Sequence, residues 1–285
     1  MAVFFALLTL IGWGVGDIFG TVAIRKIGSV AANFWWSLLG FIFASLYIPW
    51  AGWIADVKYF IFAILLATTD VLGNLFFYKG LQFGNASLNG TITGSYILIT
   101  ILISVVYFHE ALSFKQVLGV ILIFSGIILG SLNLSQLGKI KGKGIFSDKG
   151  VKYSFVTMVL WGIYFAAVRI PAEKIGWFWA GYPIYFMGTI IMLFLLKSDK
   201  LFSSVRLDRN IFLMMLLFVL FTVSANFSYN LGILQGFTSI IAPIAGAYPV
   251  LFVFLTRLVF KEKLSRQQKW GIVSSLAGII LISFS

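Results

Sequence analysis

Two aspartates lie deep inside apolar stretches of this 285-residue chain. Asp17 falls within the apolar segment 2–24, and Asp70 lies near the centre of the segment 58–79. A carboxyl group at such a depth in an apolar helix is costly, and it usually faces a cavity, a partner or a proton path. Both side chains are therefore candidates to bind a proton or the cationic group of a solute.

Helical spacing brings amide and aromatic side chains to the same faces as the two acids. Asp70 and Asn74 are four residues apart, as are Trp13 and Asp17, so each pair shares one helix face. Arg169 either reaches the membrane interface or pairs with an aspartate or with an anionic group of a solute. The asparagines have a second interpretation, in which they only hold helices together. The candidate solute- or proton-binding residues are Asp17, Asp70, Asn74, Asn226, Asn230, Trp13, Trp161, Tyr96, Tyr248 and Arg169.

A group of helix-breaking residues lies in the apolar segment 237–260. Pro243, Gly246 and Pro249 fall within seven positions, and proline removes a backbone donor, which kinks or opens a helix. The matching positions earlier in the chain hold Thr91 and Ile97 in place of the prolines. The sequence therefore predicts a gating kink in the later segment and none in the earlier one.

The residue inventory argues against enzymatic chemistry. The chain has no cysteine and one histidine, so we expect no zinc site, no other metal and no cofactor. No phosphate-binding loop is present. Gly14-Val-Gly-Asp17 resembles the G-x-G-D of intramembrane aspartyl proteases. However, Asp70 follows this motif instead of preceding it, and no Pro-Ala-Leu segment occurs near the C-terminus, so a protease is disfavoured.

Composition places the chain in a membrane. Hydrophobic residues make up 60% and charged residues 11% of the sequence, and the mean hydropathy is +1.02. A spanning helix needs about 20 mostly apolar residues, and continuous apolar runs exclude a transmembrane barrel. We therefore predict an all-α integral membrane protein with spans at 2–24, 31–51, 58–79, 86–108, 114–132, 151–171, 177–196, 210–233, 237–260 and 266–284.

The net charge of +12 is concentrated in particular loops. The loops after the first, third, fifth, seventh and ninth predicted spans carry most of the 21 lysines and arginines, which predicts that both termini lie outside the cell. The basic, Gly-rich segment 133–150 is expected to set this topology or to contact lipid headgroups. Nucleic acid is not an expected partner.

A long internal repeat organises the chain. Residues 74–129 recur about 152 positions later, and a shift of 148 aligns the earlier parts. The matched positions include Asn74 with Asn226, Tyr96 with Tyr248, Glu110 with Glu262, Trp13 with Trp161, and Lys26-Ile27-Gly28 with Lys174-Ile175-Gly176. We predict two five-helix copies, 1–132 and 151–285, joined by the linker 133–150. An odd number of helices inverts the second copy, which is the usual construction of alternating-access carriers; alternatively, duplication only enlarged the bundle.

Each copy ends in the same kind of segment. Glu110-Ala-Leu-Ser-Phe-Lys-Gln-Val-Leu-Gly119 is followed by Gly126-Ile-Ile-Leu, and Glu262-Lys-Leu-Ser-Arg-Gln-Gln-Lys-Trp-Gly271 by Gly278-Ile-Ile-Leu. This arrangement resembles the EamA-type ten-helix members of the drug/metabolite transporter superfamily. Asp17-Ile-Phe-Gly20-Thr21 is similar to the first helix of small multidrug resistance transporters, in which an acid exchanges protons for cationic substrates. The first resemblance also implies that both termini lie in the cytoplasm, contrary to the charge distribution.

Together these features predict a secondary transporter in the cell membrane that exports a small organic metabolite or drug-like solute by alternating access. Transport is either coupled to protons or uncoupled, as in a facilitator. A membrane scaffold or lipid-handling protein is the alternative from another class, and a structure without a solvent-reachable cavity beside Asp70 would favour it. The expected partners are the solute, protons and the bilayer, with the chain acting as a monomer or a homodimer.

Overall fold

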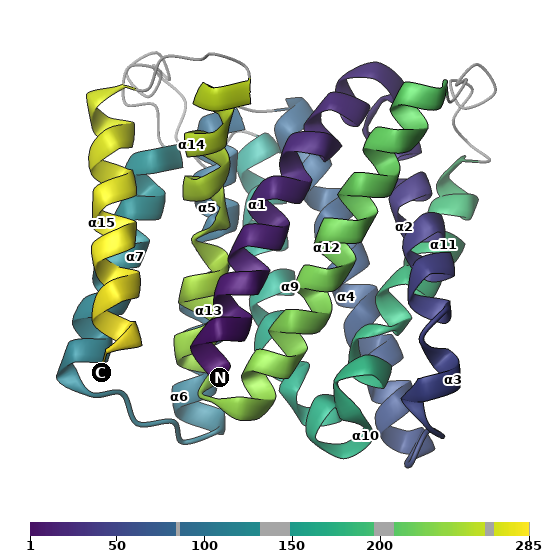
Figure 1. Ribbon diagram of the computed structural model, residues 1–285, viewed down its shortest axis with the longest axis horizontal. Helices are drawn as coiled ribbons and strands as arrows, with labels where there is room; N and C mark the ends of the chain where they lie inside the picture. Colours follow the sequence, from purple (N-terminus) through teal and green to yellow (C-terminus); the bar gives the residue numbers. More distant parts are fainter. Residues whose placement is uncertain (84–85, 132–148, 197–207, 260–264, 285) are drawn as a thin grey trace.

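The computed structural model describes residues 1–83, 86–131, 149–196, 208–259 and 265–284, and the regular structure in these ranges is entirely α-helical (Figure 1). The all-α prediction is therefore confirmed for the described part of the chain. In chain order the helices are α1 (Ala2–Ile27), α2 (Ser29–Ser45), α3 (Ile48–Ala51), α4 (Val57–Phe83), α5 (Ala86–Gly94), α6 (Tyr96–Tyr107), α7 (Phe114–Ser131), α9 (Lys149–Ala167), α10 (Arg169–Gly181), α11 (Pro183–Leu196), α12 (Arg209–Gln235), α13 (Thr238–Gly246), α14 (Tyr248–Val259) and α15 (Arg266–Ser283).

Several of these helices match the apolar segments of the sequence. Among the described residues, six helical stretches are long and apolar enough to cross a membrane, and the pair α10 and α11, bent by 52°, adds a seventh. The apolar helices Val30–Ser45 and Phe114–Gly130 are shorter. Interruptions at Leu46–Tyr47 and at Tyr182 divide two of the predicted segments into separate helices. The count of ten spans thus stays a prediction.

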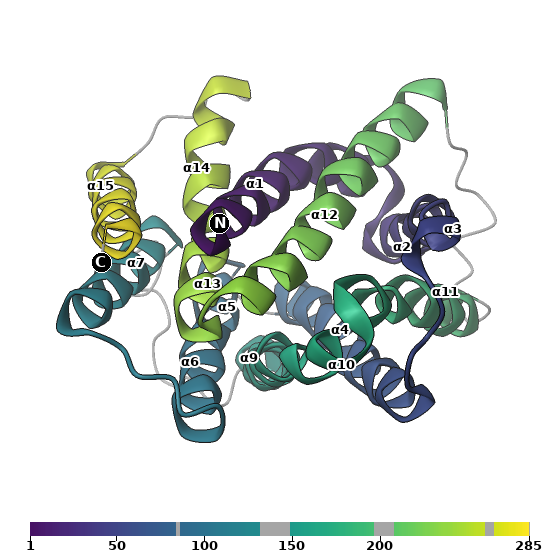
Figure 2. The same cartoon turned by 60° about the horizontal axis from the view of Figure 1, so that its bottom comes forward.

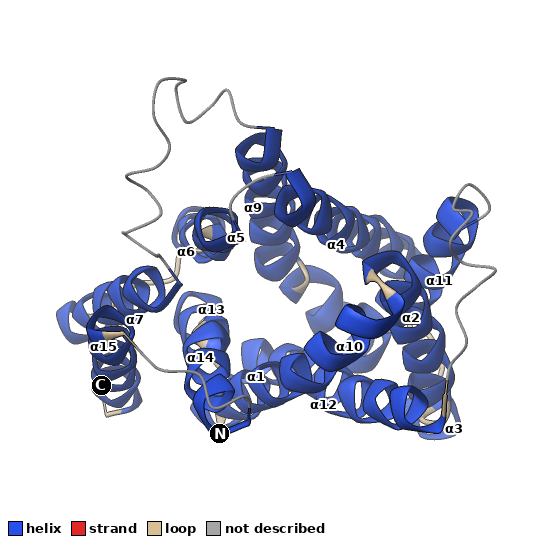
Figure 3. Ribbon diagram, turned by 90° about the horizontal axis from the view of Figure 1, so that it is seen from above, coloured by secondary structure: helices blue, strands red, loops and turns tan. Residues whose placement is uncertain are grey.

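Two groups of helices face each other across the centre of the molecule (Figure 3). The first, which we call the α1 bundle, consists of α1, α12, α13 and α14; α1 runs along α12 and contacts α13 and α14. The second, the α9 bundle, consists of α4, α5, α6 and α9; α9 runs along α4 and contacts α5 and α6. Each bundle therefore combines helices from the first and the second half of the chain. The pair α2 and α11 lies at one edge of the molecule, and the pair α7 and α15 at the other (Figures 1 and 2).

Glycines allow the closest helix contacts. A Cβ built at Gly12 would lie 2.7 Å from Cβ of Ala225, and one built at Gly16 would lie 2.6 Å from Cγ2 of Thr222, so the glycine face of α1 packs directly on α12. Real Cβ atoms do not approach other atoms so closely, so a side chain at either glycine would force the two helix backbones apart. Small residues have the same role at many membrane helix interfaces.

The repeated Lys-Ile-Gly sequences form matching joints. Gly28, between α1 and α2, has φ/ψ of 81°/162°, and Gly176, inside α10, has 83°/160°. Residues with a side chain rarely adopt this conformation, so glycine is required where the chain turns from one helix into the next. The two copies therefore use the same residue, in the same conformation, at equivalent positions.

The predicted difference in kinks between the copies is wrong. The interruption between α13 and α14 falls at Ala247, and an equivalent one falls at Ser95 between α5 and α6. The φ/ψ angles are −75°/0° and −71°/−1°, and each residue accepts a bond from the amide three positions later. A tight turn of this type forms without proline, which is why Thr91 and Ile97 do not prevent the break.

The two ends of the molecule are distinguished by the helix ends that lie there. The chain begins and ends at the lower end in Figure 1, which we call the terminal end. Helices α1 and α4 run from there to the upper end, which we call the linker end because α7 ends and α9 begins there. The segment 132–148, including most of the predicted basic linker, and Glu262 lie outside the described residues.

Candidate functional site

A chain of hydrogen bonds joins three helices at the centre of the molecule. Trp13 on α1 donates from Nε1 to Oδ1 of Asn226 on α12, over 2.7 Å. Asn226 in turn donates from Nδ2 to the hydroxyl of Tyr185 on α11, over 3.0 Å. The Asn226 amide is therefore held by the protein on both of its atoms, which favours a positioning role for this side chain. Sequence reasoning found Trp13 and Asn226 but not Tyr185.

Asp70 occupies the matching region of the α9 bundle. Asn74 donates from Nδ2 to Oδ2 of Asp70 over 3.2 Å, and also to the backbone oxygen of Asp70 over 3.1 Å. Trp161 on α9 donates from Nε1 to the same backbone oxygen over 3.4 Å. The predicted Asp70–Asn74 pair is thus formed. Asp70 is 7% exposed, and none of the described residues forms an ion pair with it.

Aromatic rings connect the two hydrogen-bonded groups. The centroid of the Phe165 ring lies 5.5 Å from that of Trp13 and 5.0 Å from that of Tyr96. The Tyr96 ring lies 5.9 Å from Trp161, and the Tyr248 ring lies 5.5 Å from Trp13. Four of the predicted aromatic residues therefore meet in one cluster, whose central ring, Phe165, sequence analysis had not selected. A continuous wall of rings suits an organic solute, and its faces attract cations.

The repeat explains why Phe165 could have been found. Under the shift of 148, Phe165 is the counterpart of Asp17, and under the shift of 152, Thr222 is the counterpart of Asp70. Thr222 accepts a bond from Nε1 of Trp36 over 2.7 Å. The positions where the two copies differ therefore face the centre from both sides, so a search of the repeat for changed polarity would have selected them.

Asp17 lies apart from Asp70. It is half-buried on α1, one turn from Trp13 toward the linker end, and makes no hydrogen bond or ion pair with any described residue. Among the described helices, α1 and α4 do not pack along each other. The two predicted acids thus belong to different bundles.

Arg169 does not form the predicted alternative pair with an aspartate. Its guanidinium pairs with Glu110 over 2.5 Å and with Glu173 over 2.6 Å, so it is not the partner of Asp17 or Asp70. The reason is its position at the start of α10, near the terminal end, where the connection between α6 and α7 meets it. Sequence analysis had used Glu110 only as a marker of the repeat.

The remaining predicted residues serve contacts between helices. Asn230 donates to the Trp177 backbone oxygen over 3.1 Å and so ties α12 to α10. Pro243 lies inside α13, and Pro249 lies in the first turn of α14, where a missing backbone donor costs little. A Cβ built at Gly246 would lie 2.5 Å from Cδ1 of Ile97, so this glycine lets α13 approach α6 closely.

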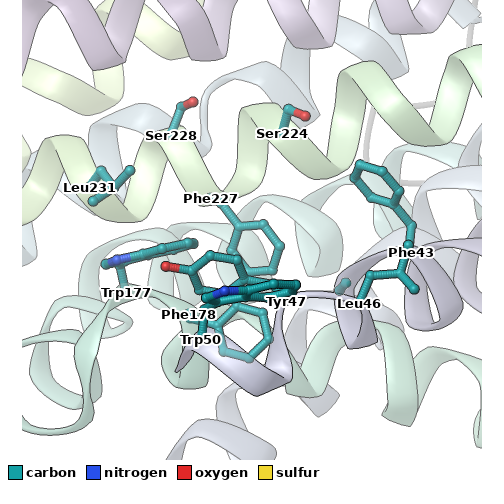
Figure 4. A pocket seen from close by; sticks show the side chains of 11 residues that line it. Phe43, Leu46, Tyr47, Trp50, Trp177, Phe178, Ser224, Phe227, Ser228 and Leu231 are labelled. Carbon is teal, nitrogen blue, oxygen red and sulfur yellow. The ribbon is translucent and has the colours of Figure 1, made fainter. Parts of the chain in front are cut away.

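One surface hollow lies between helices away from Asp70. It has a volume of about 390 Å³ and lies between α2–α3, α10 and α12, where Tyr47, Trp50 and Phe178 gather near Phe227 (Figure 4). A second, shallower hollow is lined by four apolar residues of α9. Asp70 lines neither of these two hollows.

The arrangement combines a buried carboxyl group, amides and ring faces at the junction of two bundles. Such a set can hold a proton or an organic cation, because the acid supplies charge and the rings supply apolar area with a negative face. The described residues contain no cluster of three or more side chains of the kind that would hold a metal ion.

Comparisons with known proteins agree with this architecture. A crystal structure of a protein superimposes with a TM-score of 0.81 at 14% identity, covering 99% of this chain and 96% of the other, so the two share a fold. An uncharacterised protein of Methanocaldococcus jannaschii is 30% identical over 135 residues, which is 46% of this chain and 97% of the relative. The EamA-like transporter family matches residues 1–132 and 148–284. The chain therefore belongs to the EamA-like transporter family, within the drug/metabolite transporter superfamily, and is a multi-pass membrane transporter.

Proposed function

We propose that this transporter is a secondary carrier that moves a small organic solute by alternating access between the α1 bundle and the α9 bundle. The observation that carries the proposal is the cluster at their junction, in which Asp70 lies beside Asn74 and Trp161 and is joined by rings to Trp13. A solute bound there is reached from one side or the other according to which ends of the bundles separate.

An inverted pair of five-helix copies, with ten spans in all, is part of this proposal. Three observations support it. The contact of α1 with α12 has its counterpart in that of α9 with α4. The joints at Gly28 and Gly176 have the same backbone conformation. The archaeal relative matches about half of this chain along nearly its whole length, as expected of a protein with a single copy.

The chemistry of the site supports a solute that carries positive charge. Asp70 is acidic, the surrounding wall is aromatic, and Arg169, the basic residue predicted for this region, is engaged by Glu110 and Glu173. A protonated Asp70 can release its proton when a cation binds, which would couple the two flows in opposite directions. Export is the proposed direction, supported by the likeness to a superfamily that includes exporters. An uncoupled facilitator differs in that flux would not respond to a pH gradient.

The proposed orientation in the membrane rests on the distribution of Lys and Arg between the loops. Most Lys and Arg belong to loops at the linker end, so we propose that this end faces the cytoplasm and that both termini face out. The chain has no cysteine, so single cysteines placed at the exposed positions Lys26 and Trp53, at opposite ends, can be labelled without background. Labelling from outside at position 53 and not at 26 is expected. The reverse pattern would contradict the proposed orientation.

The solute class can be tested by ligand-dependent thermal stability. Purified protein is screened against amino acids, nucleosides, sugars and quaternary amines, because a ligand that binds only the folded state raises the unfolding midpoint. We expect amines to raise the midpoint of the wild type, and Asp70→Asn to abolish that rise. Asp56→Asn, on an exposed aspartate next to the start of α4, is the matched control. A rise of equal size in Asp70→Asn would rule out binding at Asp70.

A further inference from the structure

The start of α13 is completed by a residue from the other bundle. The first amides of a helix have no partner within it, and a Ser, Thr, Asp or Asn just before the helix usually supplies one. Phe237 occupies that position here, and its side chain cannot. Instead, the Glu110 carboxylate accepts bonds from the backbone amides of Thr238 and Ser239, each over 2.8 Å. A carboxylate at this place also suits the positive end of the helix dipole.

Glu110 is held in position by its own bundle. It follows α6, after His109 in the left-handed conformation (φ 53°), and its amide donates to the Ser104 carbonyl over 3.3 Å. Arg169, just after α9, pairs with the same carboxylate and places its guanidinium 5.1 Å from the Phe108 ring centroid. The Glu110 side chain is only 2% exposed, so these bonds lie in an environment where charge-assisted contacts are strong.

At the centre, the Tyr229 hydroxyl on α12 donates to the Phe165 backbone oxygen on α9 over 2.8 Å. Among the described residues, α6 and α13 are the helices of the two bundles that pack along each other. These two helices extend from the terminal end to the breaks at Ser95 and Ala247, where a Cβ built at Gly246 would lie 2.5 Å from Cδ1 of Ile97. The counterpart helices toward the linker end are α14 and α5, which are not in comparable contact among the described residues. At Gly94, the counterpart of Gly246, the nearest atom to a built Cβ is Cγ2 of Ile127, at 3.6 Å, and it belongs to neither bundle. Among the described residues, the two bundles therefore pack along each other toward the terminal end and not to a comparable extent toward the linker end.

The acid of this contact is repeated in the sequence as Glu262, which lies outside the described residues, but the arginine is not repeated at the matching position. Under the shift of 148, the counterpart of Arg169 is Thr21 and that of Glu173 is Arg25. The basic residue therefore occupies a different helix position in the two copies, so the contact of Glu110 with Arg169 is not reproduced position for position. Without such a contact, two conformations related by the repeat would have similar energies. A contact made in only one of them raises the fraction of molecules in that conformation.

We propose that Glu110, positioned by Arg169, is a latch that holds the terminal end closed by capping α13 across the two bundles. Opening that end separates the carboxylate from the amides of Thr238 and Ser239, and closing restores both bonds. The inference rests on the proposed alternation between two conformations, but not on the identity of the solute. The latch makes the conformation closed at the terminal end the resting state.

The test measures two distances between spin labels in otherwise native, cysteine-free protein in lipid nanodiscs without solute. One pair, at Val106 and Gln235, spans the closed end, and the other, at Phe83 and Leu258, spans the opposite end; all four side chains are exposed. Glu110→Gln removes the charge and keeps the size. We expect the first distance to lengthen and the second to shorten, with the ratio of open to closed molecules rising about tenfold, as expected when a charge-assisted hydrogen bond is weakened.

Glu173→Gln is the matched control, because Glu173 binds the same arginine but is 45% exposed and lies on α10, which does not pack along α13 among the described residues. It should leave both distances unchanged. Arg169→Gln should shift both distances in the same direction as Glu110→Gln, and it provides the test if Glu110→Gln does not fold. Unchanged distances in the folded variants, or an equal change in Glu173→Gln, would overturn the latch. Because no solute is used, that result would leave the solute assignment at Asp70 standing.

Discussion

The repeated joints at Gly28 and Gly176 provide a stability test in which backbone strain can be isolated. Their φ angles of 81° and 83°, with ψ near 160°, lie in a region almost restricted to glycine, and a Cβ built at either position meets no atom within 4 Å. Alanine at either position is therefore disfavoured by the backbone conformation and not by contact with neighbouring atoms. Such strain costs on the order of 1–3 kcal/mol. At about 2–4 °C per kcal/mol, a cost of about 2 kcal/mol lowers the unfolding midpoint by roughly 4–8 °C for Gly28→Ala or Gly176→Ala.

Gly90 supplies the control with the opposite sign. It lies inside α5, its built Cβ also meets nothing within 4 Å, and its φ is not in the positive region. Alanine in a helix interior is favoured over glycine by about 0.5–1 kcal/mol, so Gly90→Ala should raise the midpoint slightly. Intrinsic fluorescence of the nine tryptophans reports unfolding in detergent without added dye. Joint variants as stable as the wild type would refute the assigned backbone conformation.

Three further substitutions separate the structural contacts around the site. Asn226→Leu removes the hydrogen-bond partner of both Trp13 and Tyr185, at a cost on the order of 1–3 kcal/mol for each buried group. In the same assay it should therefore lower the unfolding midpoint more than Trp13→Phe does. Equal effects of the two substitutions would argue against the bridge through Asn226. Gly16→Leu should cost about 1–3 kcal/mol or prevent folding, because α1 must move away from α12; a wild-type midpoint would contradict that contact. Pro243→Ala should keep transport, since the equivalent break between α5 and α6 forms without proline; loss of transport in a folded variant would show that the proline is needed.

Much of the fold could be predicted from the sequence, because long apolar runs in a membrane protein leave helices as the main way to satisfy the backbone. The family assignment, made from the repeated segments that begin at Glu110 and Glu262, is confirmed by the family match. Helix interruptions were harder to predict. The break at Ser95 has no proline to mark it and depends on local turn geometry, whereas the visible prolines suggested a difference between the copies that does not exist.

The candidate site was predicted in part, for a reason that lies in the repeat. Trp13, Trp161 and Tyr96 were selected because their positions recur, and they do meet in one cluster. Phe165, the counterpart of Asp17, was not among the candidate residues because a phenylalanine in a chain that is 18% aromatic carries little signal by itself. The partner of Arg169 could not be predicted because Glu110 is 59 positions away, and helical spacing reveals only neighbours within a helix.

The most direct test of the central claim is solute flux in liposomes under an imposed pH gradient. Wild-type protein and Asp56→Asn are compared with Asp70→Asn, using the amine that raises the unfolding midpoint most in the ligand screen. The account predicts that the gradient drives amine accumulation in the first two and that Asp70→Asn, although folded, loses at least tenfold of the gradient-driven flux. Unchanged gradient-driven flux in Asp70→Asn would contradict the assignment of Asp70 as the residue that binds and couples.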